Sequence, residues 1–477
     1  MTYNHGIMVD QRPFVLQLKG QPSAFVQVFF GTAAIHLSDD PYSVTNKPIL
    51  ITGRSEAEQK LGFNDDFEAF TLNQAIDACF VEVGTPSAVF VNVLDPIKHS
   101  TEETMEVEVV NDMVTITGKN VLLPSIQIDG LVKNEDFMVG RDDRKNVVIH
   151  ILDQSKVTEG KINMTFKVVD PEKVTSADII GGYDAETNTY QGLELIRMIY
   201  PQLSVLPKII SAPGFSRAAE VGTLLAAKSR KINGEFNAFA LIDVDGESEQ
   251  EAISKKEENG FNHGSSYVCW PNIRRGQKVY DFSAYLSARM AKQDADHAEV
   301  PFHSPSNQLL SISGLITPEG KEVFLDQVAG NQLNAKGIMT AINMAGWRTW
   351  GNVTAAYHDE LEEVEIKDRF AVMRRMFDWW SNTFIINYFN KVDKPTDTRL
   401  IESLIDSENI RANGFRGAGQ IAGARIEFRK EDNPDEQLLN GKIQFIQRVA
   451  FFSPAESIVN VLEFDPTILN EALFGGA

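Results

Sequence analysis

Short apolar runs alternate along most of this chain with segments that have helical spacing. The runs 49–51, 88–94, 207–210 and 238–242 are nearly continuous in hydrophobic residues and are bounded by glycine, proline or aspartate. Runs of this kind predict strands that are buried on both faces of a sheet. Segments with apolar residues three or four positions apart, such as 193–200, predict amphipathic helices that cover those strands. The alternation therefore predicts a mostly parallel αβ sheet.

Residues 98–175 follow a different pattern. Val107 and Val109 alternate with glutamates, and Ile162 and Met164 alternate with polar residues in the same way. Strict alternation is typical of antiparallel strands that have one buried face and one face in water. Because the αβ pattern resumes after residue 175, this segment is predicted to be an inserted β module.

The last third of the chain predicts a smaller α+β region. Two amphipathic helices are expected at about 366–390 and 397–413, followed by strands at about 424–428 and 443–451. The first helix combines two arginines with several large aromatic residues, namely Arg374, Arg375, Phe377, Trp379 and Trp380. This composition is common in a core helix with one solvated face, but it also marks protein interface hot spots. The sequence leaves both interpretations open.

The two ends of the chain carry β-forming segments that lie outside the αβ pattern. Residues 14–19 follow Pro13, and residues 458–464 are rich in valine, isoleucine and leucine before a tail for which no regular structure is expected. A strand without a partner leaves backbone donors and acceptors unpaired. Two such segments favour a protein whose copies exchange strands.

These patterns predict an α/β, multidomain fold class. It has a mostly parallel αβ core, an inserted antiparallel β module, a smaller α+β C-terminal domain and extended terminal arms. The predicted boundaries are 1–24 for the N-terminal arm, 25–97 with 176–331 for the αβ domain, 98–175 for the inserted β domain, 332–455 for the C-terminal domain and 456–477 for the C-terminal arm.

Composition narrows the class of protein. The 477 residues suffice for several domains, and the two cysteines exclude a disulfide scaffold and fit a reducing compartment. A formal net charge of −21 argues against a general binder of nucleic acid, since phosphate neutralisation needs a basic surface. No apolar run approaches the roughly 20 residues of a membrane span, so we expect no membrane-spanning segment.

One acidic loop is the strongest candidate for chemistry. Asp243–Glu249 follows a predicted parallel strand, and ligands often bind at that end of a strand in αβ sheets. The spacing does not match a calcium loop, because Gly246 is fourth rather than sixth. Ser216, further upstream, is expected to cap a helix. A metal- or nucleotide-dependent αβ enzyme with a β accessory domain therefore remains an alternative that this loop alone supports.

Other candidate sites lack the context that their chemistry needs. The donors Asp294, Asp296, His297, Glu299 and His303 do not have the spacing of a helical zinc site. The glycine-rich segment 414–423 follows a helix and precedes a strand, which reverses the order of a dinucleotide loop. No nucleophile motif surrounds the possible bases and nucleophiles His263, His303, His358, Ser265, Ser304 and Cys269. We therefore predict no catalytic residues, no metal site and no cofactor.

Several short segments occur in a fixed order along the chain: 29–33, 48–62, 88–94, 208–214, 240–243, 302–307, 333–338 and 347–354. Taken in this order, they resemble the landmarks of the contractile tail sheath proteins of contractile-tailed phages and phage-tail-like bacteriocins. The chain departs from the family pattern at Leu61, where an aromatic residue is usual, and at Asn352-Val353, which replaces Ala-Arg.

The resemblance implies a structural subunit and not an enzyme. Such a subunit would polymerise as a helical tube of hexameric rings around an inner tail tube, and would contract to drive that tube through a target cell envelope. The implied partners are copies of the same chain, the inner tail tube protein, and the baseplate and tail terminator proteins. The implied location is a virion tail assembled in the cytoplasm of a bacterial host, or the tail of a related bacteriocin or secretion particle.

The resemblance also implies that terminal arms add strands to a sheet in the C-terminal domain of neighbouring subunits. The residues expected in the arms are Phe14, Leu16, Leu18, Ile458, Val461, Leu462 and Phe464. The residues expected on the recipient strands are Ile443, Phe445, Val449 and Phe451. The bulkier face of the second arm, with Leu462 and Phe464, is expected to pack on the recipient.

In this family a helical part of the C-terminal domain touches the inner tube. The predicted helix 366–390 is rich in aromatic residues and fits a core position. The helix 397–413 carries alternating charges around a short apolar stripe, which suits contacts that must break on contraction. We therefore expect Arg399, Glu402 and Asp406 to contact the tube.

Overall fold

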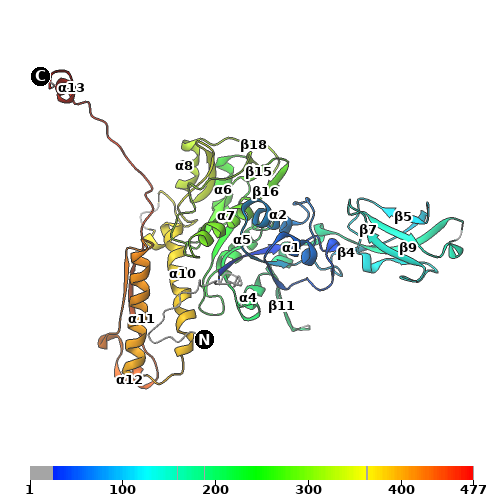
Figure 1. Cartoon of the computed structure of the whole chain (residues 1–477), viewed down its shortest axis with the longest axis horizontal. Coiled ribbons are helices and arrows are strands. Elements are labelled where there is room, and N and C mark those ends of the chain that lie inside the picture. The colour runs from blue at the N-terminus through cyan, green and yellow to red at the C-terminus, as the bar shows by residue number, and fades with distance from the viewer. Residues whose placement is uncertain (1–24, 158, 187, 361–363, 476–477) are drawn as a thin grey trace, which may run out of the picture.

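A computed structural model of the chain describes residues 25–157, 159–186, 188–360 and 364–475, and its centre is an eight-stranded sheet (Figure 1). Every pairing from β3 to β19 is parallel, and the antiparallel strands β2 and β20 form the edges. The predicted mostly parallel core is confirmed. In order across the sheet the strands are β2 (Pro48–Ile51), β3 (Ala88–Asn92), β1 (Phe25–Gly31), β12 (Leu206–Ser211), β13 (Phe239–Asp243), β14 (Ser266–Cys269), β19 (Ile338–Asn343) and β20 (Trp347–Trp350).

Strand β1 lies inside the sheet, although the hydrophobic pattern did not single it out. All seven of its residues are buried between β3 and β12. Gln27 interrupts the apolar run, and its side-chain amide is buried where Nε2 lies 3.7 Å from the Sγ atom of Cys79. A buried polar residue with a partner elsewhere in the fold hides a central strand from pattern analysis.

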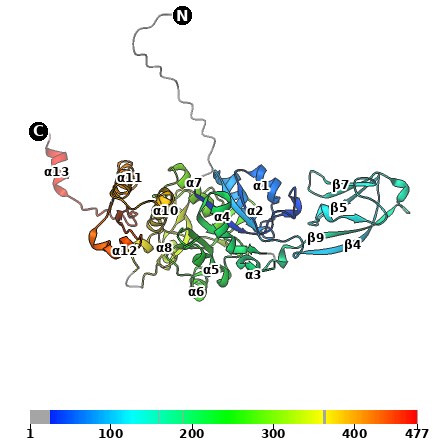
Figure 2. The same ribbon diagram turned by 90° about the horizontal axis from the view of Figure 1, so that it is seen from below.

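Helices cover both faces of the sheet (Figure 2). On one face lie α2 (Thr71–Asp77), which continues as a π-helical segment (Ala78–Val83), and α7 (Phe282–Asp296). On the other face lie α4 (Ile196–Leu203) and α5 (Ala219–Lys228). The remaining helices of the body are α1 (Arg54–Leu61), α3 (Ser176–Ile180), α6 (Glu249–Glu258) and α8 (Gln327–Ala335).

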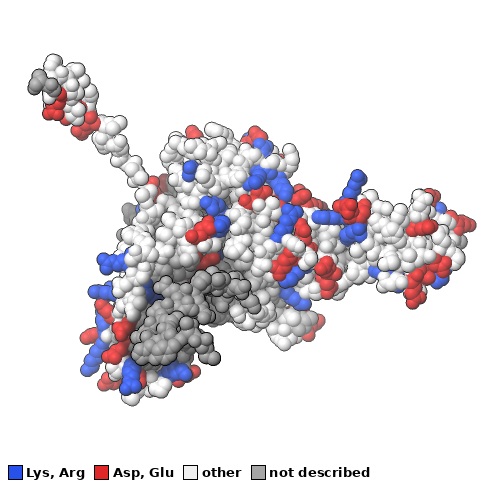
Figure 3. Space-filling model, in the orientation of Figure 1, with Lys and Arg blue, Asp and Glu red and all other residues white. Residues whose placement is uncertain are grey.

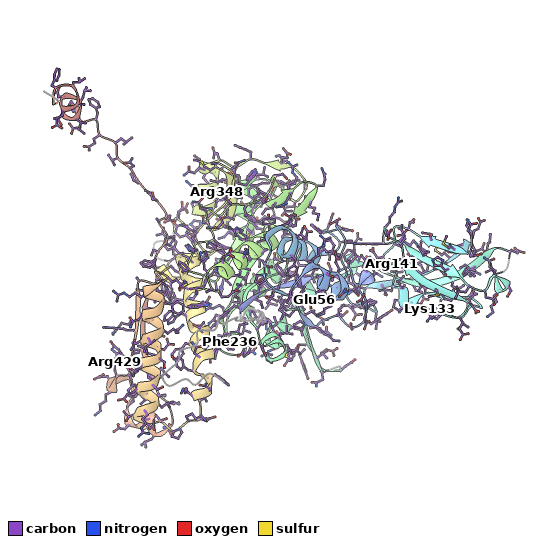
Figure 4. All side chains as sticks on the ribbon, in the orientation of Figure 1. Glu56, Lys133, Arg141, Phe236, Arg348 and Arg429 are labelled. Carbon is purple, nitrogen blue, oxygen red and sulfur yellow. The ribbon has the colours of Figure 1, made fainter. Side chains whose placement is uncertain are left out.

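The segment predicted as an inserted β module is antiparallel and projects from the body (Figures 1 and 2). It encloses a hydrophobic cluster separate from that of the body. Arg141 (Figure 4) ties it to the body by donating from Nη2 to the carbonyl oxygen of His36, at 2.7 Å. Its two sheets are β4 (Ser100–Glu108), β9 (Lys161–Val169) and β6 (Gln127–Ile128), and β5 (Met113–Ile116), β8 (Val147–Ile151) and β7 (Phe137–Arg141).

Two small antiparallel sheets complete the body. One is the hairpin of β10 (Gly182–Asp184) and β11 (Thr189–Gln191). The other contains β16 (Lys278–Tyr280), β15 (Asn272–Arg275), β17 (Gly314–Ile316) and β18 (Glu322–Val323).

The C-terminal region lies beside the body and consists of two long helices and a two-stranded sheet (Figure 1). The predicted helices are confirmed, as are the strands, although β22 is shorter than expected. The elements are α9 (Ile366–Arg369), α10 (Ala371–Tyr388), α11 (Thr398–Gly417), β21 (Gly423–Glu427), α12 (Asp435–Leu439), β22 (Ile446–Ala450) and α13 (Pro466–Phe474). Among the described residues, no helix is both long and apolar enough to cross a membrane.

Candidate assembly site

Helix α11 supports the two-stranded sheet of β21 and β22. The buried carboxylate of Glu408 accepts hydrogen bonds from Arg411 at 2.8 and 2.9 Å and from the side-chain amide of Gln447 at 2.8 Å. Ala424 and Val449, which are paired across the sheet, pack against the main core. Polar anchors and apolar contacts together hold this small sheet on the helix, so its position in the subunit is fixed.

The two edges of this sheet differ. On β21, the backbone N–H of Ile426 donates to Oδ1 of Asn409 on α11 at 3.1 Å, so the helix occupies that edge. On β22, the only strand partner among the described residues is β21, which runs antiparallel to it. An unpaired strand edge is a template for another strand. The open edge of β22 is therefore the best recipient in this region.

The four expected recipient residues are split by the structure between two places. Phe451 is buried, and its ring lies 4.9 Å from that of Phe377 and 6.0 Å from that of Trp380. Val449 is half-buried on the same core-facing side. The strand begins only at Ile446, so Ile443 and Phe445 precede it. They lie near α12, where the rings of Phe445 and Phe428 are 5.5 Å apart.

The expected C-terminal arm extends away from the subunit (Figures 1 and 2). Its large apolar residues are between 73% and 88% exposed, and no strand is assigned from 451 to 465. Exposed apolar side chains in this number are typical of a surface that binds another protein. The residues are Ile458, Val459, Val461, Leu462 and Phe464. Phe14, Leu16 and Leu18 of the other expected arm lie outside the described residues.

A groove lies beside the beginning of the arm. Residues 452–458 line it together with residues of the 302–307 loop, α8 and Trp350, and the space has a volume of about 780 Å³. Arg369 contacts this segment, with Nη2 2.6 Å from Oε2 of Glu456. The arm therefore leaves the body next to α9.

The tail beyond the arm contains a helix that the sequence analysis did not predict. Asp465 caps α13 by accepting a hydrogen bond from the backbone N–H of Thr467 at 2.8 Å, and Pro466 occupies its first turn. None of its residues is buried. A nine-residue helix gains little stability in water without packing, so α13 requires a partner surface.

The residues expected to contact the tube all lie on exposed positions of α11. Arg399, Glu402 and Asp406 are exposed, whereas Leu404 and Glu408 of the same helix are buried. No ion pair of these three residues is found in the part of the chain that the structure describes. This side of α11 is thus available for contacts with another molecule.

Helix α10 is a core helix, which settles the choice that the sequence left open. Arg375 is buried and pairs with Asp294 of α7, at 2.5 Å between Nη2 and Oδ2. Asp378 pairs at 2.7 Å with both Arg374 and Arg230. The aromatic residues of the helix pack against Phe415 and Phe451. Buried charges that pair across elements bind this helix to the body.

The donors proposed as a loose metal cluster are used in such pairs instead. Asp294 contacts Lys208 at 3.4 Å as well as Arg375, and Glu299 contacts Lys208 at 2.6 Å. His297 uses Nδ1 at 2.7 Å from the carbonyl oxygen of Gln293. Within the described residues, no group of three or more His, Cys, Asp or Glu side chains could hold a metal ion.

The acidic loop after β13 is closed by hydrogen bonds. Asp243 is buried and accepts from the backbone N–H of Ser283 at 2.8 Å and from the hydroxyl of Ser216 at 3.1 Å. Ser216 therefore does not cap α5, contrary to expectation. Burial, with repulsion from Asp281, raises the pKa of Asp243 to about 7. A carboxyl group enclosed in this way supports the fold and is not open to a substrate.

The glycine-rich segment 414–423 leads from the end of α11 into β21, as its order indicated. Helix α11 ends at Gly417, and Gly419 has a φ of 71°, which a residue with a side chain rarely adopts. The chain then enters β21 at Gly423. The segment joins a helix to a strand, and no strand precedes it to form a dinucleotide site.

Two residues that position the site escaped the sequence analysis. Asn409 lies within α11 and occupies the edge of β21, and Gln447 lies on β22 and reaches Glu408. Asparagine is a weak helix former, so its place in the middle of a helix was a usable signal. Gln447 gave no comparable signal, because polar and apolar residues both fit a half-buried strand.

Comparison with known proteins gives one consistent result, although no protein-family model matches the chain. The tail sheath protein of Burkholderia phage BcepMu is 27% identical over 486 residues, covering 96% of each chain. The tail sheath protein of Escherichia phage P2 is 28% identical over 307 residues, covering 61% of this chain and 73% of its own. A sheath complex of an extracellular contractile injection system in its contracted state has a TM-score of 0.58 at 13% identity, covering 98% of this chain and 99% of that chain. That structural likeness shows a shared fold.

Proposed function

Because the chain is a contractile tail sheath protein, we propose that its copies polymerise into a helical tube of hexameric rings around an inner tail tube. Contraction of that tube of subunits then drives the inner tube through a cell envelope. The location is the tail of a virion assembled in a bacterial cytoplasm, or of a related injection particle. Copies of the chain, the tube protein, and baseplate and terminator proteins are the proposed partners.

One observation supports this proposal most directly: a donor and a recipient for strand exchange occur on the same subunit. The donor is the exposed segment 458–464, and the recipient is the open edge of β22. Strand addition satisfies backbone groups on both partners, and the alternating side chains set the register. When the two partners are copies of one chain and the contact does not close on itself, the product is a helix.

The N-terminal segment is the second proposed donor. Phe14, Leu16 and Leu18 alternate as an arm strand should. The chain enters the described structure at β1, whose first residue, Phe25, lies near the cavity between α10 and the strands β12 and β13. An arm that precedes β1 thus starts close to the C-terminal region.

The proposed tube contact is the exposed side of α11 with Arg399, Glu402 and Asp406. Surface ion pairs contribute only about 0–1 kcal/mol each and weaken with salt. Many weak pairs along a tube add to a firm grip, yet each breaks readily when the subunit moves. This suits a sheath that must release its tube.

Burial of additional surface supplies the proposed energy of contraction. At about 25 cal/mol per Å², burying roughly 200 Å² of apolar surface releases about 5 kcal/mol per subunit. Summed over the many subunits of a polymer, this free energy drives contraction without nucleotide hydrolysis.

Deletion of the two arms separately tests strand exchange. We expect chains lacking residues 1–20, or lacking 452–477, to stay folded and monomeric. Residues 452–475 contribute none of the residues that form the hydrophobic clusters, and residues 1–20 precede the αβ pattern of the sequence. Circular dichroism measures the fold, and electron microscopy measures tube formation. Sheaths of normal length from both truncated chains would refute strand exchange.

Charge reversal on α11 tests the tube contact. The triple variant Arg399→Glu, Glu402→Lys, Asp406→Lys should still form sheath polymers but should no longer assemble around the tube protein. The matched control is Lys161→Glu with Glu106→Lys, which reverses the charges of an exposed pair on the inserted β module instead. Tube-filled sheaths from the triple variant would show that another surface holds the tube.

A further inference from the structure

The C-terminal helix α13 exposes an apolar face that no described part of the chain covers. At 100° per residue, Ile468, Leu469, Ala472 and Leu473 fall on one side of the helix. Thr467, Asn470 and Glu471 fall on the other side, together with the exposed Phe474 at the end of the helix. Leu473 is 64% exposed and Ile468 is equally open. A short amphipathic helix of this kind binds by placing its apolar face on a complementary surface.

The chemistry of the segment argues for a protein surface. Residues 452–477 contain four acidic residues and no lysine or arginine, and the projecting part of Figure 3 accordingly shows red and no blue. Binding to nucleic acid or to an anionic membrane depends on basic residues. A helix with an apolar face and no basic residue instead fits an apolar protein surface.

A matching surface lies at one end of the β21–β22 sheet. We name it the tip cluster: Phe428, Leu438, Leu439, Ile443 and Phe445. None of these residues belongs to either hydrophobic cluster, and Leu439 is 88% exposed. Arg429 (Figure 4) follows Phe428 and pairs with Asp432 at 2.6 Å, and Arg425 and Arg448 on the adjoining strands both pair with Glu427. Acidic and basic residues are balanced at this end of the sheet, because Glu431, Asp435 and Glu436 lie there as well as Lys430 and Lys442. The exposed apolar side chains, and not a net charge, therefore distinguish this surface.

The connection between arm and helix restricts where α13 can bind. Pro466 follows Phe464 by two residues, so α13 begins within about 10 Å of the end of a strand formed by 458–464. Addition of that strand antiparallel to β22, the commoner arrangement, brings Phe464 to the end of β22 that starts at Ile446. The tip cluster lies at that end, whereas Phe451 at the other end is buried.

We propose that α13 of one subunit docks on the tip cluster of a second copy of this chain. The inference rests on the proposed strand exchange and extends it with a second, side-chain contact. The second copy is the occupant because the segment projects away from its own subunit, at the end of the C-terminal region opposite to α12 (Figure 1). The apolar helix face then covers Leu439 and its neighbours, and Glu471 on the opposite side stays in water.

Mixed single-cysteine crosslinking tests this contact. The native Cys79 and Cys269 are buried, and burial raises the pKa of both thiols, so they give little background. Sheath assembled from equal amounts of Leu439→Cys and Leu473→Cys chains should form a mixed dimer on mild oxidation. The control mixture pairs Leu473→Cys with Phe324→Cys, an 81% exposed site on a different surface, and should give at least about tenfold less dimer. Equal yields, or no dimer from either mixture, would overturn the proposal.

Two further variants separate this contact from strand exchange. Leu469→Asp places a charge on the apolar face of α13, and Asn470→Asp places the same charge on its polar face. Leu469→Asp should raise the concentration needed for polymerisation about tenfold or more, and Asn470→Asp should leave it unchanged. Equal behaviour of the two variants refutes docking of α13. Normal polymers from a chain lacking 452–477 would refute strand exchange itself, and an intramolecular crosslink in a monomeric Leu439→Cys, Leu473→Cys chain would show that α13 binds its own subunit.

Discussion

The central sheet and the β21–β22 sheet differ in how their strand edges are paired and their faces are covered. In the central sheet, interior strands such as β1 and β13 are fully buried, and helices cover both faces. The β21–β22 sheet has two strands, one supported face and one open edge. The first is complete within one chain. The second has an open edge and face, to which the strand exchange proposed above would add a strand from another subunit.

The largest expected effect comes from a charge in the complete sheet. Ile210 of β12 is fully buried, and Ile210→Asp should destabilise the subunit by more than about 4 kcal/mol, because an unpaired buried charge has no compensation. Urea unfolding of the soluble fraction measures this. The matched control is Leu462→Asp in the arm, which is 88% exposed and should leave the midpoint unchanged. Equal losses of unfolding free energy for the two variants would show that the central sheet and the arm do not differ in their contribution to the stability of the subunit.

The buried ion pair between the regions should give the next largest effect. Arg375→Met leaves Asp294 with Lys208 alone, at 3.4 Å, and should cost about 3 kcal/mol of unfolding free energy. The control Arg448→Met removes an exposed partner of Glu427 and should cost less than about 1 kcal/mol. Chemical denaturation measures the loss of unfolding free energy for both variants. A smaller loss for Arg375→Met than for Arg448→Met would contradict a stabilising role of the Arg375–Asp294 pair.

The junction between body and β module should respond to pH. Burial, reinforced by Arg141 and Lys145, lowers the pKa of His36 to about 3. The unfolded chain binds a proton here at about pH 6.5, so the free energy of unfolding should fall as the pH drops from 6.5 toward 3. His36→Phe should remove this contribution, at most about 3 kcal/mol at pH 4. Unfolding of both proteins at pH 7 and pH 4 checks it, and parallel losses would assign the effect to other groups.

Substitutions in the C-terminal arm should have the smallest effect on the stability of the isolated subunit. They should nevertheless have a large effect on assembly. Leu462→Asp and Val459→Asp should both leave monomer stability unchanged, since both positions are at least 80% exposed. Sheath yield should fall further for Leu462→Asp, because the Leu462 and Phe464 face carries the bulkier contacts. Sedimentation of polymers measures the yield. A milder defect for Leu462→Asp would place the opposite face of the arm on the recipient.

Sequence patterns predicted the strands that are buried on both faces, because such strands must be apolar along their whole length. Residues 88–92 and 239–243 are examples, and the antiparallel module was equally clear from its strict alternation. Strand β1 was missed because Gln27 breaks its apolar run and finds its partner, Cys79, only in the tertiary structure. Helix α13 could have been predicted, since Asp465 and Pro466 are ordinary helix-start residues.

The candidate site was predicted less completely for a physical reason. The alternation of Ile443, Phe445, Val449 and Phe451 suggests one face of one strand, but the strand starts at Ile446. Two hydrogen bonds decide which face of this strand points inward. Gln447 donates to Glu408, and Asn409 accepts from Ile426 at the edge of β21. These are contacts between residues far apart in the chain, which no local pattern contains. The resemblance to sheath proteins indicated the kind of interface, and the structure indicated which edge is open.

The single open edge of β22 has a consequence for growth. In the proposed exchange through the C-terminal arm, each subunit offers one recipient edge and one donor strand, so these contacts all run in the same direction along the assembly. A stack built in this way has two chemically different ends: unfilled sheet edges face outward at one, and unplaced segments hang free at the other. Proteins that start and stop such a stack cannot be interchanged, because one must supply a strand and the other must accept it.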